Sequence, residues 1–184
     1  MKPVERTEIV DYVTYDEGRD AFRDEVMAAK ARRRVHLGEY LTLLFENHLT
    51  VRYQIQEMMR AERIVKEADI RREIETYNEL LGGEGEIGCT LLIEIADPAV
   101  RDVKLVEWLR LPERCYMLLE DGTRAWAKFD ERQRGEGRLS SVQYLKFDTG
   151  GKAPVATGVD MPELQLETVL TAEQRKALSE DLSG

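Results

Sequence analysis

Two five-residue stretches of this chain are nearly identical. Residues 42–46 read Thr-Leu-Leu-Phe-Glu and residues 90–94 read Thr-Leu-Leu-Ile-Glu. Each is a short apolar run of the kind that forms a buried strand, and each ends in a glutamate. An isolated buried charge is costly, so a buried glutamate must be paired, protonated, hydrogen-bonded or bound to metal. The repeat therefore predicts two buried strands, each ending in an acid that needs a partner.

Helical periodicity surrounds these two strands. It predicts helices over residues 14–34, 51–66 and 70–81, with Thr14 and Thr50 as the caps of the first two. Asp97-Pro98 predicts a further helix, because an N-cap followed by proline suits the first helical turn.

The second half of the chain has the pattern of an antiparallel meander. Asp121-Gly122 is a strong hairpin signal between the strand-like runs 115–120 and 123–129. A polar loop over 131–138 then leads to a third strand over 139–147. After residue 148 the pattern is less regular, with an edge strand expected over 154–159. Thr171 and Gln174 form a capping box that predicts a terminal helix.

These elements predict an α+β fold, in which N-terminal helices pack on a mixed or antiparallel sheet that includes the C-terminal meander. A chain of 184 residues suits one domain. We expect a single α+β domain over residues 1–148. Residues 149–184 are expected to form a C-terminal extension with a short terminal helix packed on that domain.

The composition argues against several classes of function. The formal net charge is −9, which disfavours binding to nucleic acid or to anionic membranes. No apolar run approaches the ~20 residues that span a bilayer, and residues 1–11 lack the apolar region of a signal peptide. We therefore expect a cytoplasmic protein. The two cysteines and two histidines lack the spacing of a structural zinc site.

A third acid, Glu62, falls on the apolar stripe of the helix predicted over 51–66. If the two repeated strands are parallel neighbours in register, Glu46 stands beside Glu94, with His48 close by. Packing of the helix on that face would add Glu62. Carboxylate and imidazole ligands suit non-haem iron or manganese. The candidate metal ligands are Glu46, His48, Glu62 and Glu94.

Two other readings of these acids remain open. Arginines close in sequence can satisfy the same glutamates in a buried Arg–Glu network without any metal. Alternatively, the acids form a small-molecule or catalytic site, although no residue pattern assigns a catalytic role. The polar cluster considered in both readings comprises Glu46, Glu57, Glu62, Glu94, Arg52, Arg60 and Arg63.

Longer blocks carry a family resemblance. They are the run from Leu37 to Arg63, Tyr77-Asn78, residues 90–94, and the run from Ser141 to Phe147. Over nearly its whole length the chain resembles the bacterial domain-of-unknown-function family 3501, with a weaker match after about residue 148.

The resemblance implies no established activity and carries over no catalytic residue. It implies an association with rubrerythrin and an iron–sulfur oxidoreductase, and so with oxidative stress. We therefore expect an accessory or interaction protein that works with a redox partner. The formation of homo-oligomers is compatible with this expectation. The alternative is a small-molecule or metal-dependent enzyme that uses the glutamate cluster. The sequence leaves open which of the two it is.

Overall fold

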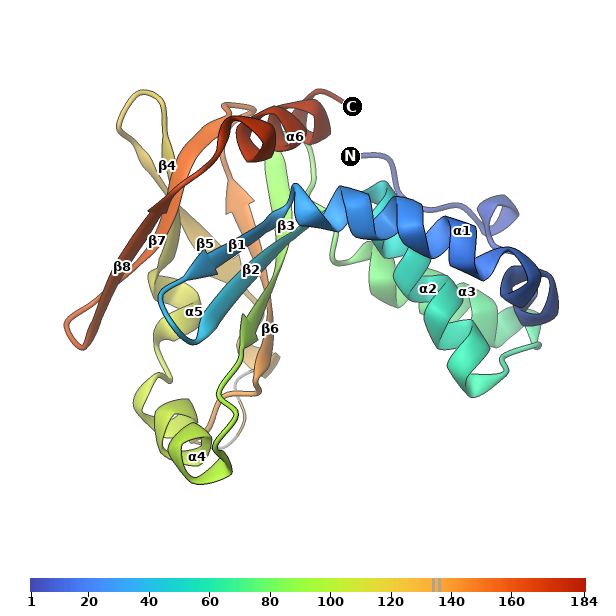
Figure 1. Ribbon diagram of the computed structural model, residues 1–184, viewed down its shortest axis with the longest axis horizontal. Coiled ribbons are helices and arrows are strands. Elements are labelled where there is room, and N and C mark those ends of the chain that lie inside the picture. The colour runs from blue at the N-terminus through green and yellow to red at the C-terminus, as the bar shows by residue number, and fades with distance from the viewer. Residues whose placement is uncertain (134, 136) are drawn as a thin grey trace.

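The computed structural model describes residues 1–133, 135 and 137–184, and its central feature is a nearly closed antiparallel barrel (Figure 1). The strand order is β1-β2-β3-β6-β5-β4-β7-β8, and every pairing in it is antiparallel. The strands are β1 (Arg34–Leu37), β2 (Leu41–Glu46), β3 (Glu86–Ile93), β4 (Cys115–Leu119), β5 (Arg124–Phe129), β6 (Val142–Asp148), β7 (Pro154–Met161) and β8 (Leu164–Val169).

The two end strands of the sheet, β1 and β8, approach each other and almost complete the barrel. The Thr168 hydroxyl donates to the carbonyl of His36 at 2.9 Å. Gly38, at φ 61°, begins the turn after β1, and a Cβ there would lie 3.0 Å from a methyl group of Leu166. Side-chain contacts thus cover the edge that an open sheet would expose.

The barrel interior is filled by side chains, as expected for a barrel of this strand number. Inward-facing residues alternate with outward-facing ones along each strand. Those with no exposed surface include Leu43, Phe45, Leu91, Met117 and Phe147. Helix α6 (Ala172–Ser183) covers one end of the barrel, where Leu178 is fully buried, and α4 (Pro98–Glu107) and α5 (Leu111–Arg114) lie towards the other end (Figure 1).

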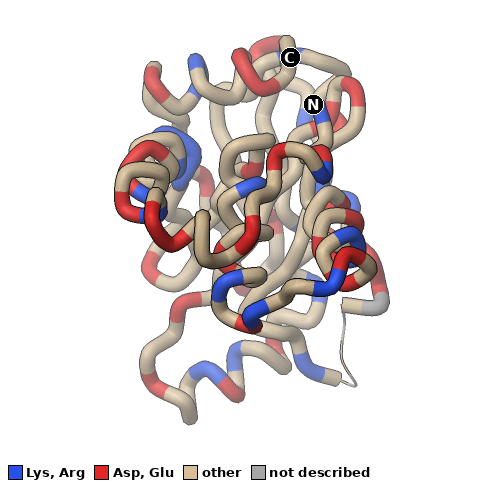
Figure 2. The backbone as a smooth tube through the Cα atoms, turned by 90° about the vertical axis from the view of Figure 1, so that its right-hand side faces the viewer, with Lys and Arg blue, Asp and Glu red and all other residues tan. Residues whose placement is uncertain are grey.

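The remaining helices form a separate lobe beside the barrel (Figure 1). They are η1 (Arg6–Glu8), α1 (Tyr12–Ala31), α2 (His48–Glu62) and α3 (Glu67–Asn78); a further short helix, η2 (Glu131–Gln133), follows β5. The lobe has its own apolar core, which includes Val51, Ile55, Met59, Ile70 and Ile74. Figure 2 shows acidic and basic residues interspersed over this side of the molecule.

The predicted fold class is wrong. The helices do not form a layer on an open mixed sheet; instead, the sheet curves into a barrel and most of the helices form a lobe of their own. The segment after residue 148 supplies β7 and β8, which pair with each other, and β7 also pairs with β4. Strand β7 is therefore not an edge strand.

Several local predictions are confirmed. Asp97 caps α4, which begins at Pro98, and Thr171 and Gln174 form the capping box of α6. Residues 120–123 connect β4 and β5 as a hairpin. Two caps differ from the prediction, because Asp11 caps α1 and Asn47 caps α2. The loop predicted over 131–138 includes positions 134 and 136, which lie outside the described residues. No described helix has the length and apolar character needed to cross a bilayer.

Candidate functional site

Glu46, at the end of β2, is a buried acid held by two threonine hydroxyls. Its side chain accepts hydrogen bonds from Thr50 Oγ1 at 2.5 Å and from Thr90 Oγ1 at 2.6 Å. Lys30 on α1 lies near enough for its charge to interact with the carboxylate. Burial lowers the pKa of Lys30, and the negative charge of Glu46 acts in the opposite direction. Glu46 therefore sits at the joint between the barrel and the helical lobe.

Glu94 does not stand beside Glu46, so the expected parallel register is wrong. Strands β2 and β3 pair antiparallel, with Glu46 opposite Gly88 and Leu41 opposite Ile93. Glu94, just after β3, accepts a hydrogen bond from Thr42 Oγ1 at 2.5 Å. The two acids consequently lie at opposite ends of the strand pair.

His48 and Glu62 lie at opposite ends of α2. His48 Nε2 is 2.9 Å from Glu8 Oε1, and its Nδ1 is 3.0 Å from the carbonyl of Lys2. Glu62 is exposed at the last residue of the helix. Among the described residues, no three His, Cys, Asp or Glu side chains are grouped so that they could hold a metal ion. The predicted ligands for iron or manganese are not brought together.

The arginines of the predicted network contact other groups. Arg60 binds Asp16, and Arg52 donates to the carbonyl of Glu8 and lies over the Phe22 ring. Arg63 is exposed and ends α2 in the left-handed conformation.

Glu57, in contrast, is part of an Arg–Glu pair, but with an arginine outside the predicted set. Arg19 Nε and Nη2 donate to its two oxygens at 2.7 and 2.8 Å, and the Tyr15 hydroxyl donates at 2.7 Å. These hydrogen bonds, that of Arg19 foremost, lower the pKa of Glu57. Tyr15 and Arg19 are four residues apart on α1, a spacing that places both on one helix face.

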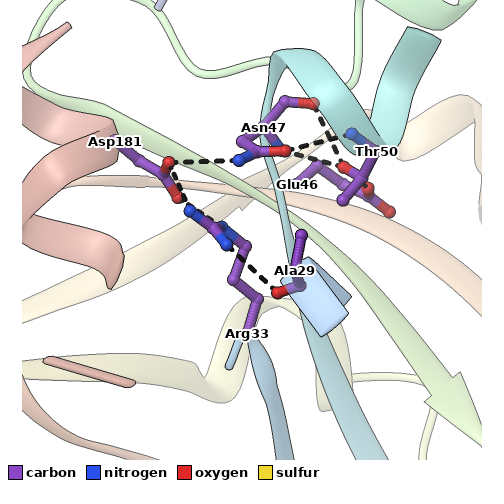
Figure 3. A network of polar contacts seen from close by, with 6 residues as sticks. All are labelled: Ala29, Arg33, Glu46, Asn47, Thr50 and Asp181. Carbon is purple, nitrogen blue, oxygen red and sulfur yellow. Dashed lines mark hydrogen bonds and ion pairs between the residues drawn. The ribbon is translucent and has the colours of Figure 1, made fainter. Parts of the chain in front are cut away.

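A second ion pair, which the sequence does not predict, joins the segment after α1 to the terminal helix α6 (Figure 3). Arg33 Nε and Nη2 donate to Asp181 Oδ2 and Oδ1 at 2.7 and 2.8 Å, and Asn47 Nδ2 donates to Asp181 at 3.2 Å. Arg33 also donates to the carbonyl of Ala29. No local pattern signals this contact, since Asp181 lies in a terminal helix far along the sequence.

A cleft lies between the two lobes, and we call it the interlobe cleft. It has a volume of about 600 Å³, within the range of small-molecule sites. It lies between α3 on one side and β5, β6 and the segment after β5 on the other. Its lining residues are Thr76, Tyr77, Glu79, Leu80, Lys128, Phe129, Asp130, Gln133, Tyr144, Leu145 and Lys146.

The residues that line the interlobe cleft are suited to binding a ligand. Tyr77 and Tyr144 line it together with two lysines, and Phe129, whose side chain packs against the barrel core, also borders it. Burial raises the pKa of Tyr77, and so does the nearby Glu73. The aromatic and cationic groups of the cleft are of the kinds that bind small molecules.

The two cysteines lie away from the cleft, in the barrel core. Burial raises the pKa of the Cys115 thiol to about 12 and that of Cys89 well above its usual value. Both thiols are fully protonated at neutral pH and shielded, so they behave as small apolar side chains.

The chain belongs to a family of proteins of unknown function. Residues 3–182 match the family model described as "Protein of unknown function (DUF3501)". The chain is also similar to a protein of unknown function from Burkholderia pseudomallei K96243, known from a crystal structure. The two are 27% identical, the match covers 98% of this chain and 100% of that one, and the TM-score is 0.89. No curated protein matches the chain.

Proposed function

We propose that the protein is a non-catalytic accessory protein that works by binding a small molecule in the interlobe cleft. The observation that carries this proposal is the position and lining of that cavity. It lies where α3 meets the barrel, and two tyrosines and two lysines are among the residues that line it. Junctions between structural units are a preferred location for small-molecule sites.

The location of the cleft explains how binding would serve an accessory role. A molecule in it contacts α3 from the helical lobe and β5 and β6 from the barrel. A ligand that favours one arrangement of two lobes increases the population of that arrangement. A partner protein that contacts both lobes would then bind the occupied and empty forms with different affinity.

The partner that we propose is a redox protein of the rubrerythrin or iron–sulfur oxidoreductase class, and the family resemblance supports this choice. The test is size-exclusion chromatography of the purified chain mixed with each purified partner at micromolar concentration. Co-elution with either one is expected. If the chain elutes separately from both partners, with and without a cleft ligand, the proposed redox association is wrong. The proposed ligand binding in the cleft is tested independently.

The cleft itself is tested by a thermal-shift screen of a small-molecule library. A ligand at a hundred times its Kd adds about 2.7 kcal/mol of stability, which for a chain of this size raises Tm by roughly 5–10 °C. Thr76 is exposed and lines the cleft from α3, so Thr76→Trp fills part of it. Compounds that stabilise the protein are expected to lose that effect in Thr76→Trp.

Glu75 provides the matched control. It is also exposed on α3 and directly precedes Thr76, but it does not line the cleft. Glu75→Trp should therefore keep the full thermal shift of every compound that Thr76→Trp abolishes. If no compound distinguishes the two variants, the interlobe cleft is not the binding site and the proposal fails.

A further inference from the structure

We propose that the interlobe cleft takes a planar aromatic monocarboxylate, with its ring between Tyr77 and Tyr144 and its carboxylate on Lys146. This assignment rests on the proposed function, because it names the ligand class of the same cleft.

The aromatic walls come from separate elements on the two sides of the cleft. Tyr77 belongs to α3 and Tyr144 to β6. In the described part of the chain, Tyr77 and Tyr144 make no ring contact with each other, whereas Tyr116 and Trp126 pack at 5.5 Å. Tyr144 is 39% exposed. Offset stacking and edge-to-face packing favour a planar ring over a saturated one in such a space.

The backbone at Tyr144 is held in place before any ligand enters. The backbone N–H of Tyr144 donates to Gln133 Oε1 at 2.7 Å, and Gln133 Nε2 donates to the Tyr144 carbonyl at 3.1 Å. Fixing this part of β6 in advance reduces the entropy that is lost when a ligand binds.

Lys146 is the cation that we assign to the ligand. Lys128 and Lys146 lie opposite each other on β5 and β6. Lys128 Nζ is already neutralised, at 3.0 Å from Glu86 and 3.1 Å from Asp148. Lys146 is half-buried, and no carboxylate of the described residues lies within 4 Å of its ammonium group. The charge of Lys146 also acts on Glu86, and a ligand carboxylate would add a direct charge-assisted hydrogen bond to its ammonium group.

The charge around the cleft limits the charge of the ligand to one. Glu79 also lines it, and the whole chain carries a formal charge of −9. A second negative charge on the ligand would be repelled by Glu79 and by the net charge of the chain. The cleft therefore selects a monocarboxylate over a phosphate ester or a nucleotide.

Isothermal titration of the full-length chain tests the assignment with defined probes. Benzoate and indole-3-acetate are compared with benzamide, which lacks the charge, cyclohexanecarboxylate, which lacks the planar ring, and phenyl phosphate, which carries more charge. The aromatic carboxylates are expected to bind at least about tenfold more tightly than each comparison compound. Equal binding of benzamide, cyclohexanecarboxylate or phenyl phosphate would overturn the assignment.

Lys146→Met keeps most of the apolar stem, removes the charge, and should weaken binding of the aromatic carboxylates by about tenfold. Lys176→Met removes an exposed lysine from α6 and should leave binding unchanged. Unchanged affinity in Lys146→Met would contradict the role of Lys146. If that variant does not fold, the comparison of benzoate with benzamide on the unaltered chain decides the charge requirement.

The two proposals fail in different ways. If compounds bind in a manner that Thr76→Trp abolishes but show no preference for an aromatic carboxylate, this ligand class is wrong and the proposed function stands. If no compound is sensitive to Thr76→Trp, both proposals fail together.

Discussion

Arg33 and Asp181 are 148 residues apart in the sequence, yet they form an ion pair with two hydrogen bonds that is almost excluded from water. Their side chains are only 5% and 9% exposed. The pair joins the end of α1 to α6, and Asn47, which caps α2, adds a third segment to it (Figure 3). The helix that covers one end of the barrel is thereby tied to the helical lobe.

Removing one partner of this pair should be strongly destabilising. Asp181→Ala leaves the Arg33 guanidinium buried without its counter-charge, for which the expected cost is about 3–5 kcal/mol. Urea unfolding measures this loss, and limited proteolysis should cleave the terminal helix faster. Glu180→Ala, at a neighbouring exposed position, should change the stability by less than about 0.5 kcal/mol. Equal unfolding midpoints for the two variants would show that the pair contributes nothing.

Gly88 is a position on β3 that has no room for a side chain. A Cβ there would lie 1.8 Å from the carbonyl oxygen of Leu80, because the turn after α3 passes directly over the strand. Gly88→Ala must displace backbone and should cost at least about 1–3 kcal/mol of unfolding free energy. Thermal or urea unfolding checks the value.

Gly18 offers the opposite case within the same chain. It lies in the interior of α1, and a Cβ there would meet nothing within 4 Å. Gly18→Ala should therefore stabilise the protein by about 0.5–1 kcal/mol, since alanine has the higher helix propensity. A destabilising Gly18→Ala, or a neutral Gly88→Ala, would contradict this account of the two sites.

Local signals in the sequence predicted local structure well. The cap at Asp97, the hairpin at Asp121-Gly122 and the capping box at Thr171 all involve groups within a few residues of each other. Their hydrogen bonds and backbone conformations depend little on the rest of the fold. These local structures can therefore be predicted from a single sequence.

The predictions were wrong where contacts between distant segments determine the structure. The repeated runs ending in Glu46 and Glu94 fix two strands, but their direction relative to each other depends on how the chain returns after α3, and it returns antiparallel. Glu62 has the right angular position on α2, but it lies at the end of the helix, beyond the apolar core. Angular periodicity alone does not reveal that axial position.

The interlobe cleft could not be foreseen for the same reason. Its principal residues, Tyr77 and Tyr144, are far apart in the sequence, and each looks like an ordinary side chain of its own element. The pairing of β6 with β3, the strand that follows α3, places α3 and β6 on the two sides of one cavity, and this pairing joins segments far apart in the sequence.

The buried carboxylate of Glu46 should depend on its threonine donors. Thr90→Val keeps the shape but removes the hydroxyl that donates to Glu46 at 2.6 Å, with an expected cost of about 1.5–3 kcal/mol for a bond to a charged group. Thr157→Val is the matched control, because that buried hydroxyl donates to the neutral carbonyl of Tyr116, a bond worth about 0.5–1.5 kcal/mol. Chemical unfolding should rank Thr90→Val as the more harmful change; the reverse order would show that the hydrogen bond from Thr90 to Glu46 contributes less than the bond from Thr157 to the Tyr116 carbonyl.

The Arg19–Glu57 pair should make stability fall in acid. Because Arg19 and Tyr15 lower the pKa of Glu57 below its usual 4.5, the pair stabilises the fold above pH 4.5, and this contribution is lost as the pH falls through the lowered value. Glu57→Gln should therefore be less stable than the unaltered chain near neutral pH and show a smaller further loss between about pH 5 and pH 3. Urea unfolding across this range measures both effects. Glu75→Gln, at an exposed position on α3, should keep the slope of the unaltered chain; a Glu57→Gln variant with that same slope would show that the ion pair does not control acid stability.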